Sequence, residues 1–167
     1  IPLVIGTTGF GPDHYDTINE AAKEIPIFQA SNFSIGIALL KSMLKNLSRY
    51  SGDAFIDIIE KHAACKEDSP SGTALELAQL FTDKKVHPTQ CPRNPEDLHI
   101  HSIRSNGYTF DHDVRFSFGA EELTLSHTVF NREVFAKGAL QAAAFLKDQP
   151  PGRYNMEDLV SSIEVAK

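Results

Sequence analysis

Apolar positions in the first part of the chain alternate between short continuous runs and helical spacing. Residues 1–5 and 25–28 are short apolar runs, which are typical of buried strands in a parallel sheet. Between them, Asp13 or Asp16 can cap a helix that places Ile18 on its apolar face. The order strand, glycine-rich turn, helix and strand predicts a parallel α/β arrangement at the start of the chain.

In the middle and at the end of the chain, some segments have apolar residues at helical spacing and others alternate strictly between apolar and polar residues. Apolar side chains recur at four-residue steps over 35–47, which predicts a helix. Alternation of apolar and polar residues farther along predicts a hairpin with one solvated face. The further expected elements are strands over 55–60 and 98–104, loops over 61–70 and 83–97, a helix starting near 71, a hairpin of 114–118 with 123–129, and helices over 135–146 and 156–165.

Composition narrows the class of protein. The 167 residues are 41% hydrophobic and 23% charged, which is ordinary for a globular chain. A formal net charge of -6 argues against a basic nucleic-acid-binding surface, and no apolar run approaches the roughly 20 residues of a membrane span. The two cysteines, Cys65 and Cys91, are too few for a disulfide scaffold. Since the chain opens on Ile1 without a signal peptide, we expect a cytoplasmic protein and a piece of a longer one.

The densest polar cluster lies in residues 60–74, where a predicted strand gives way to a predicted helix. This is the usual place for a ligand in α/β folds. The helix start at Ser71-Gly72-Thr73 favours an anion, Lys66 is a nearby cation, and His62 titrates close to neutral pH. Together they indicate a small anionic substrate that needs protonation. The alternative is that Ser71 or Thr73 only caps a helix and that the charges belong to a solvated loop.

Two other patterns are weaker indications of a ligand. The turn Gly6-Thr7-Thr8-Gly9 could bring the backbone close to a nucleotide. It lacks the Gly-x-Gly-x-x-Gly fingerprint, however, and a glycine turn between a strand and a helix is more often plain turn geometry. His99 and His101 stand two apart on a predicted strand, and hence on one face. Because no pair of ligands has standard zinc spacing, we predict no metal site.

Five short segments occur in an order that matches one enzyme family. They are IGTTGF at 5–10, SNFSIG at 31–36, EKHAACKEDSPSGTA at 60–74, IHSIR at 100–104 and FAKGA at 135–139. Each piece is short, but the combination is specific and covers essentially the whole chain. In these segments the sequence resembles the dihydrodipicolinate reductases, also called 4-hydroxy-tetrahydrodipicolinate reductases, of lysine and diaminopimelate biosynthesis.

The resemblance implies an α/β fold in which an α+β substrate domain with a mixed sheet is attached to a partial Rossmann-type nucleotide-binding domain. It implies that 1–32 are a remnant of the dinucleotide-binding domain, 33–132 the substrate-binding and oligomerisation domain, and 133–167 a segment that returns to the first. The family reduces a cyclic dicarboxylate, 4-hydroxy-tetrahydrodipicolinate, to tetrahydrodipicolinate with NADPH or NADH, and it forms homotetramers.

Residue roles also follow from the resemblance. His62 and Lys66 match the family's proton donors, and Ser71, Gly72 and Thr73 match its substrate-binding residues. The residues that match cofactor-contacting positions are Gly6, Thr7, Thr8, Ala30, Ser31, Asn32 and Phe33.

The chain also departs from the family pattern. Ala63 stands where a second histidine is usual, and Asn106 and Phe110 replace two glycines. Since the Gly-x-Gly-x-x-Gly part is absent, we expect little reductase activity from this chain alone. Two alternatives stay open: a non-catalytic assembly or binding module that keeps the fold, and a reductase of a related cyclic dicarboxylate.

Overall fold

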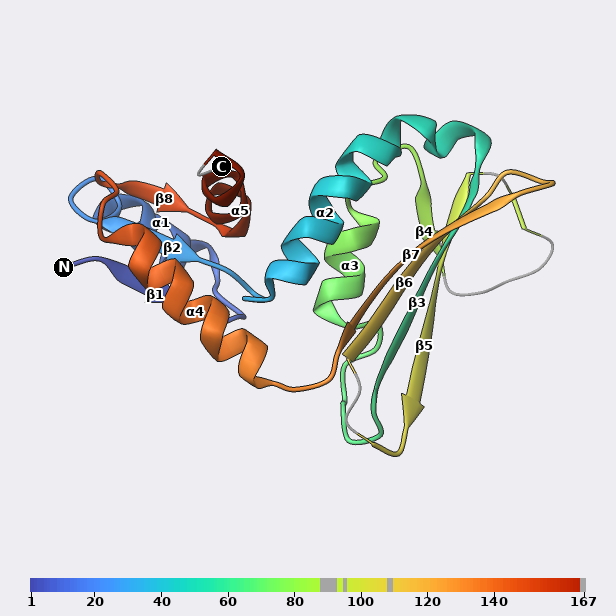
Figure 1. Ribbon diagram of the computed structural model, residues 1–167, viewed down its shortest axis with the longest axis horizontal. Helices are drawn as coiled ribbons and strands as arrows, with labels where there is room; N and C mark the ends of the chain where they lie inside the picture. The colour runs from blue at the N-terminus through green and yellow to red at the C-terminus, as the bar shows by residue number, and fades with distance from the viewer. Residues whose placement is uncertain (88–92, 95, 108–109, 166–167) are drawn as a thin grey trace. The chain divides into compact units, whose positions relative to one another are not determined.

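The computed structural model describes residues 1–87, 93–94, 96–107 and 110–165, and it confirms the predicted mixed α/β class (Figure 1). The chain divides into two compact units. Unit 1 comprises Ile1–Leu39 with Arg132–Lys167, and unit 2 comprises Leu40–Asn131. Cys91 lies outside the described residues, as does part of the predicted loop over 83–97. None of the described helices is long and apolar enough to cross a membrane.

Unit 1 is built on a parallel sheet of three strands in the order β1-β2-β8. The strands are β1 (Leu3–Ile5), β2 (Pro26–Gln29) and β8 (Gly152–Tyr154), and the helices that belong wholly to this unit are α1 (Pro12–Ala21), α4 (Glu133–Leu146) and α5 (Met156–Val165). The predicted succession of strand, turn, helix and strand at the start of the chain is confirmed. The third strand, β8, was not expected from the sequence.

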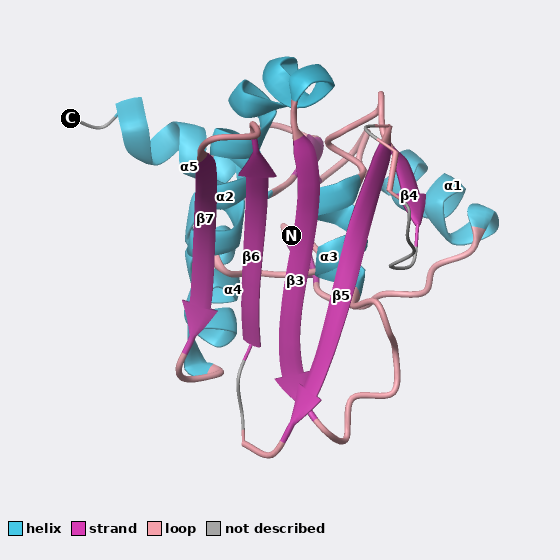
Figure 2. Ribbon diagram, turned by 90° about the vertical axis from the view of Figure 1, so that its right-hand side faces the viewer, coloured by secondary structure: helices cyan, strands magenta, loops and turns pink. Residues whose placement is uncertain are grey.

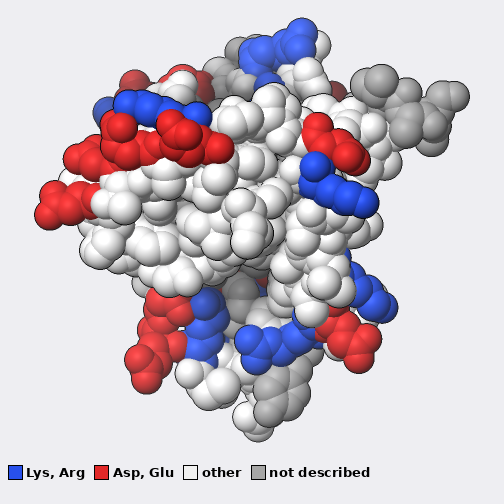
Figure 3. Space-filling view, turned by 90° about the vertical axis from the view of Figure 1, so that its left-hand side faces the viewer, with Lys and Arg blue, Asp and Glu red and all other residues white. Residues whose placement is uncertain are grey.

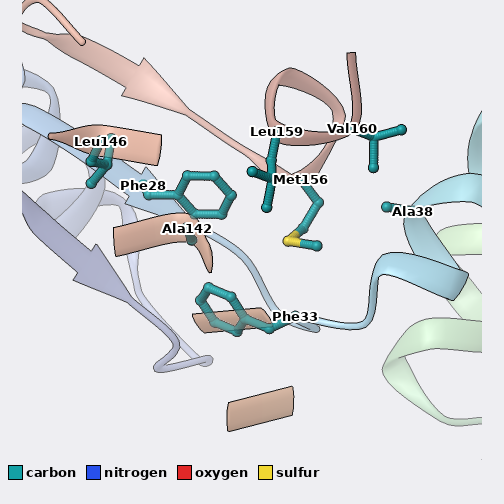
Figure 4. Close-up of a cluster of buried hydrophobic side chains, with 8 residues drawn as sticks. All are labelled: Phe28, Phe33, Ala38, Ala142, Leu146, Met156, Leu159 and Val160. Atoms are coloured by element: carbon teal, nitrogen blue, oxygen red, sulfur yellow. The ribbon is translucent and has the colours of Figure 1, made fainter. Parts of the chain in front are cut away.

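A core of aromatic and aliphatic side chains holds β2, α4 and α5 together (Figure 4). The rings of Phe28 and Phe33 stack with their centroids 6.0 Å apart. The buried members of this cluster are Phe28, Phe33, Ala38, Ala142, Leu146, Met156, Leu159 and Val160. A Cβ added to Gly138 of α4 would lie 1.8 Å from the carbonyl oxygen of Phe33, so only glycine allows this approach. The close packing fixes the path of the chain as it leaves β2.

The surface of unit 1 is partly apolar. Leu3 on the edge strand β1 is 45% exposed and Leu140 on α4 is 72% exposed. On the face drawn in Figure 3, charged groups lie in separate clusters around a broad uncharged area. Unit 1 therefore leaves some apolar surface in contact with solvent, which is common on protein surfaces when the residues are scattered.

Unit 2 is built on a mixed sheet of five strands in the order β4-β5-β3-β6-β7 (Figure 2). The strands β4, β5 and β3 run parallel, whereas β6 is antiparallel to both β3 and β7. The strands are β3 (Phe55–Ala63), β4 (Lys85–His87), β5 (Asp97–Ser105), β6 (Phe110–Ser117) and β7 (Glu122–Val129). The helix α2 (Ile35–Leu47) begins in unit 1, continues into unit 2 and is followed by the 3-10 helix η1 (Ser48–Asp53), while α3 (Gly72–Ala78) lies within unit 2.

The two faces of the five-stranded sheet differ in what covers them. Helix α3 and the part of α2 that belongs to unit 2 lie against one face, here called the covered face, and no helix of the described part of unit 2 lies on the other, the open face (Figure 2). Along β3, Ile58 and Glu60 are buried on the covered face, whereas Asp57 and Ile59 are half-buried on the open face. Alternate residues of β3 therefore face two different environments.

Local differences from the predicted elements have physical causes. Strand β3 extends to Ala63, because β5 and β6 pair with it over its polar end, so His62 lies on a strand and not in a loop. Strand β4 lies within the predicted loop over 83–97, where it pairs with β5. On β7, Leu123 is 42% exposed, because this strand is at the sheet edge. The apolar face predicted for the hairpin is therefore only partly buried.

Candidate active site

Strand register gathers polar side chains on the covered face of the sheet. Glu60 of β3 lies beside Ser102 of β5 and opposite His112 of β6, and His62 lies beside Arg104. His112 has no part in the site predicted from the sequence, yet it is buried with Glu60 and His62. The sequence feature that could have indicated its burial is the alternation of inward-facing and outward-facing residues, which continues from Phe116 and Val114 to position 112.

Glu60 is the centre of this group. Its side chain is completely buried and its Oε1 accepts hydrogen bonds from Arg104 Nη1 at 2.9 Å and from the Ser71 backbone N–H at 3.4 Å. Its Oε2 contacts Nδ1 of His62. One carboxylate thus connects β3, β5 and the start of α3. Sequence reasoning included Glu60 in the polar cluster but gave it no role.

The charge state of Glu60 follows from its neighbours. Burial acts to raise its pKa, but the adjacent Ser102 and Arg104 and the positive charge available on His62 outweigh burial. The pKa of Glu60 is therefore lower than usual, and the side chain is ionised at neutral pH. A buried carboxylate with an arginine partner is a fixed negative charge beside the imidazole.

His62 is held in a neutral state with a defined orientation. Burial lowers its pKa, the Glu60 carboxylate opposes this effect, Lys66 adds to it, and the net pKa is below the ordinary value. The ring packs edge-on against His112 and Phe110, with centroids 5.2 and 5.8 Å away. Because the carboxylate contacts Nδ1, the proton of the neutral ring is favoured there, which leaves Nε2 to exchange protons with a ligand.

The loop after β3 links the second predicted proton donor to this group. Lys66 Nζ donates to Asp68 Oδ1 at 2.6 Å, and Arg104 Nη2 donates to the Asp68 carbonyl at 2.6 Å. The same guanidinium therefore binds Glu60 and the loop that carries Lys66. The hydrogen bond from Lys66 also lowers the pKa of Asp68. Arg104, which has no role in the sequence-based site, connects the surroundings of His62 with Lys66.

The start of α3 contains the three residues matched to substrate binding. Ser71 is the N-cap: its Oγ accepts from the Ala74 N–H at 3.2 Å and lies 3.3 Å from His112 Nε2. The capping interpretation is thus correct for Ser71. Gly72 is exposed, and a Cβ added there would meet no atom within 4 Å. The fold itself does not require glycine at 72, whereas a ligand close to the backbone would. Thr73 is half-buried beside it.

Unit 1 brings the two predicted cofactor segments together. Gly6, Thr7 and Thr8 follow β1, and residues 30–33 follow β2. Since β1 and β2 are parallel neighbours, both segments lie at the carboxyl edge of the sheet, the usual ligand position in such folds. The Ala30 N–H donates to the Ile5 carbonyl at 3.1 Å.

The four residues after β2 differ in what they can offer a ligand. The side chain of Phe33 is buried in the core, and its ring lies 3.0 Å from the place of a Cβ at Gly6. A ligand at position 33 would therefore meet main-chain atoms. Asn32 Oδ1 accepts from the Ser34 N–H at 2.9 Å, and Ser31 is exposed.

One group at the active site has metal-ligand atoms close together. Glu60, His62 and His112 each place one such atom within 4.8 Å of the others. Glu60 already accepts hydrogen bonds from Arg104 and from the Ser71 N–H, and it contacts His62. Cys65, which precedes Lys66, is an exposed free thiol.

Comparison with known proteins gives one consistent result. Residues 1–33 match the sequence model described as dihydrodipicolinate reductase, N-terminus, and residues 36–160 match the one described as dihydrodipicolinate reductase, C-terminus. Similar curated proteins include the 4-hydroxy-tetrahydrodipicolinate reductases of Caldanaerobacter subterraneus subsp. tengcongensis, 43% identical over 170 residues, and Clostridium tetani, 42% identical over 171 residues. These alignments cover 96% and 97% of this chain and 67% of each relative.

A solved structure agrees with the sequence comparisons. It is the dipicolinate-bound dihydrodipicolinate reductase of Paenisporosarcina sp. TG-14, with a TM-score of 0.73 and 28% sequence identity. The alignment covers 95% of this chain and 64% of that one, so this chain spans slightly less than two thirds of its length. On the sequence matches and on the shared fold, the chain belongs to the dihydrodipicolinate reductase family.

Proposed function

We propose that this chain supplies the substrate-binding and proton-transfer part of an NAD(P)H-dependent enzyme that reduces 4-hydroxy-tetrahydrodipicolinate to tetrahydrodipicolinate in lysine and diaminopimelate biosynthesis. The observation that carries the proposal is the buried pair of Glu60 and His62, which Arg104 connects to the loop bearing Lys66. An acid–base group beside cations suits a dicarboxylate that must accept a proton. Unit 2 would be the substrate-binding and oligomerisation part, and unit 1 would belong to the nucleotide-binding part.

The charges of the site suit a doubly negative ligand. Without a ligand His62 has a lowered pKa, in part because of Lys66. A dicarboxylate would neutralise Lys66 and raise the pKa of His62, so that the imidazolium forms when substrate is present. Lys66 would bind a carboxylate, the open space at Gly72 would admit the ligand to the backbone, and His62 Nε2 would deliver a proton. The bound nicotinamide would supply the hydride, and the overall reaction releases water.

NADPH or NADH would contact the two segments at the carboxyl edge of the sheet in unit 1. Gly6, Thr7 and Thr8 and residues 30–33 fit one part of such a cofactor, because the loops converge there. The Gly-x-Gly-x-x-Gly turn, which holds the pyrophosphate in such domains, does not occur in this sequence. We therefore expect the chain alone to bind NADPH with a Kd weaker than micromolar. Calorimetric titration tests this, and micromolar binding would contradict it.

The partners in this proposal are the cyclic dicarboxylate and further copies of the chain, with no nucleic acid and no membrane, in the cytoplasm. The open face of the sheet, which no described helix of unit 2 covers, would contact other copies in a homotetramer (Figure 2). Sedimentation of the chain over a range of concentrations checks the assembly. A monomer at every concentration would show that this chain does not assemble through the open face.

Dipicolinate, the ligand named for the Paenisporosarcina structure, is a suitable probe of the substrate site. We expect it to bind the chain, and we expect Lys66→Gln to weaken binding at least tenfold, because a carboxylate loses its cation. Lys61→Gln is the matched control, since Lys61 lies on the open face of β3. Equal affinities for the two variants would remove Lys66 from the site.

Turnover separates the reductase from the non-catalytic module suggested by Ala63, Asn106 and Phe110. The N-terminal segment of the Caldanaerobacter relative can be joined to this chain to restore the length of the family. We expect reductase activity from the joined protein and its loss in His62→Ala. A folded joined protein that binds dipicolinate but has no activity would favour the binding module. A substrate panel on the same protein tests the reductase of a related cyclic dicarboxylate.

A further inference from the structure

We propose that the open face of the five-stranded sheet holds a divalent transition-metal ion, with Zn²⁺ the best match, bound by Asp57, His99 and His101. Each of the three residues places one possible ligand atom within 4.8 Å of the others. This is a second site, on the face of the sheet opposite to Glu60 and His62. Spacing along the sequence did not indicate it, because its ligands come from strands about 40 residues apart.

Strand register brings the three ligands together. Asp57 of β3 lies directly beside His99 of β5. His101 is two residues farther along β5, so its side chain is on the same face. Parallel pairing over eight consecutive residue pairs, from Ile56 with Leu98 to Ala63 with Ser105, fixes this arrangement. The ligands therefore stand on a rigid part of unit 2, as a preformed metal site requires.

His99 provides an independent indication of a ligand. The residue is only 2% exposed, yet its Nε2 has no hydrogen-bond partner among the described residues. A buried polar atom without a partner destabilises a fold unless something binds it. A metal ion on the ring nitrogen would satisfy this atom.

The orientation of Asp57 suits the same ion. Arg93 Nη1 donates to its Oδ2 at 2.7 Å, which leaves Oδ1 directed to the His101 ring, 2.8 Å from Nε2. Arg93 thus orients the carboxylate as a neighbouring group does in many metal sites. When the ion binds, His101 gives up any proton on Nε2 and coordinates through that nitrogen.

The donor set decides which ion fits. Two imidazoles and one carboxylate suit Zn²⁺ and its neighbours in the first transition row, whereas Mg²⁺ and Ca²⁺ prefer oxygen ligands. Zinc bonds to these ligands are roughly 2.0–2.2 Å long, so the side chains must draw together by a small movement. Three protein ligands leave one tetrahedral position for water.

The test uses the chain after treatment with a chelator. Titration with Zn²⁺ should show one equivalent bound with a micromolar or smaller Kd, and Co²⁺ should give the visible absorption of a tetrahedral site. Asp57→Asn and His101→Gln, which keep the size of the side chains, should each weaken binding at least tenfold. His87→Gln is the matched control, because His87 of β4 lies beside His99 but outside the ligand set.

Other results would overturn the proposal. Binding that survives both Asp57→Asn and His101→Gln would exclude these ligands, as would the absence of binding at millimolar Zn²⁺ in a chain with native circular dichroism. Binding that is lost in His62→Gln would place the ion at the Glu60 group instead. None of these measurements involves dipicolinate or turnover, so the metal site and the proposed function can fail separately.

Discussion

The two faces of the five-stranded sheet carry the same kinds of side chain in different surroundings. On the covered face Glu60 contacts His62 and Arg104, and on the open face Asp57 contacts His101 and Arg93. The Glu60 side chain has no exposed surface, whereas 22% of the Asp57 side chain is exposed. The two groups therefore differ in burial more than in residue type, and this difference accompanies the two roles proposed for them, proton transfer at Glu60 and His62 and cation binding at Asp57.

Isosteric removal of each carboxylate charge is the strongest test of that difference. We expect Glu60→Gln to lower the free energy of unfolding by roughly 3–5 kcal/mol, because Arg104 then lacks its buried partner. Asp57→Asn should cost at most about 2 kcal/mol, since its ion pair keeps access to water. Urea denaturation of the two variants measures both values. Equal losses would show that the faces do not differ in this respect.

The pH dependence of stability should come mainly from the covered face. Burial and the nearby His62 lower the pKa of His112 to about 4, so the folded state favours its neutral form. The unfolded chain binds more protons as the pH falls below about 6.5. Stability is therefore complete above that pH and decreases as the pH falls toward 4, by about 2 kcal/mol between pH 6.5 and 5.

A pair of histidine variants assigns this effect. Denaturation midpoints measured from pH 7.5 to 5 should vary less with pH in His112→Asn than in the unchanged chain. His99→Asn on the open face is the comparison, because burial and the adjacent Arg93 also lower the pKa of His99. A larger flattening in His99→Asn would reverse the expected order of the two faces.

A ligand bound on the covered face should change the pKa of a histidine on that face and not on the open face. Dipicolinate should raise the pKa of His62, because its negative charges offset the effect of Lys66. Nitrogen-detected NMR titration of the histidines, with and without dipicolinate, follows each ring. The pKa of His99, on the open face, should be unchanged. A shift confined to His99 would place the ligand on the open face.

The smallest expected effect is at Gly72. Gly72→Ala should leave the free energy of unfolding within about 0.5 kcal/mol, because a Cβ there meets open space. It should nevertheless weaken dipicolinate binding about fivefold if the ligand approaches the backbone, a difference of about 1 kcal/mol. Urea denaturation and calorimetry on the same sample separate these two outcomes. A loss of stability without a change in affinity would remove Gly72 from the ligand site.

Patterns that depend on neighbours in sequence predicted much of the fold. Apolar spacing located α2, α4 and α5, and the run at the start of the chain located β1. Strand β8 was missed because three residues after two prolines show no period, and pairing with β2 defines the strand. The last residues of β3 looked like a loop because Lys61 and His62 are polar, although both are paired in the sheet.

The candidate site, like the fold, was predictable only where its residues are neighbours in the sequence. The polar segment of residues 60–74 was visible in the sequence, and with it His62, Lys66 and the start of α3. The contributions of Arg104 and His112 were not visible as parts of one group, because strand register in the folded sheet brings them to Glu60. Strand register also brings Asp57 to His99 and His101, so the proposed metal ligands could not be recognised as one group from the sequence.

The hydrogen bonds of Glu60 and Ser71 also bear on how this chain folds. The bond from Arg104 to Glu60 spans 44 residues, and the contact of Ser71 with His112 spans 41. Contacts of such separation form only after long segments of chain have closed, which slows folding. Until β3 has paired with both β5 and β6, Glu60 is an ordinary solvated acid and His62 an ordinary imidazole. The influence of Glu60 on the pKa of His62 therefore arises together with the sheet, and the titration of His62 reports on the completion of folding.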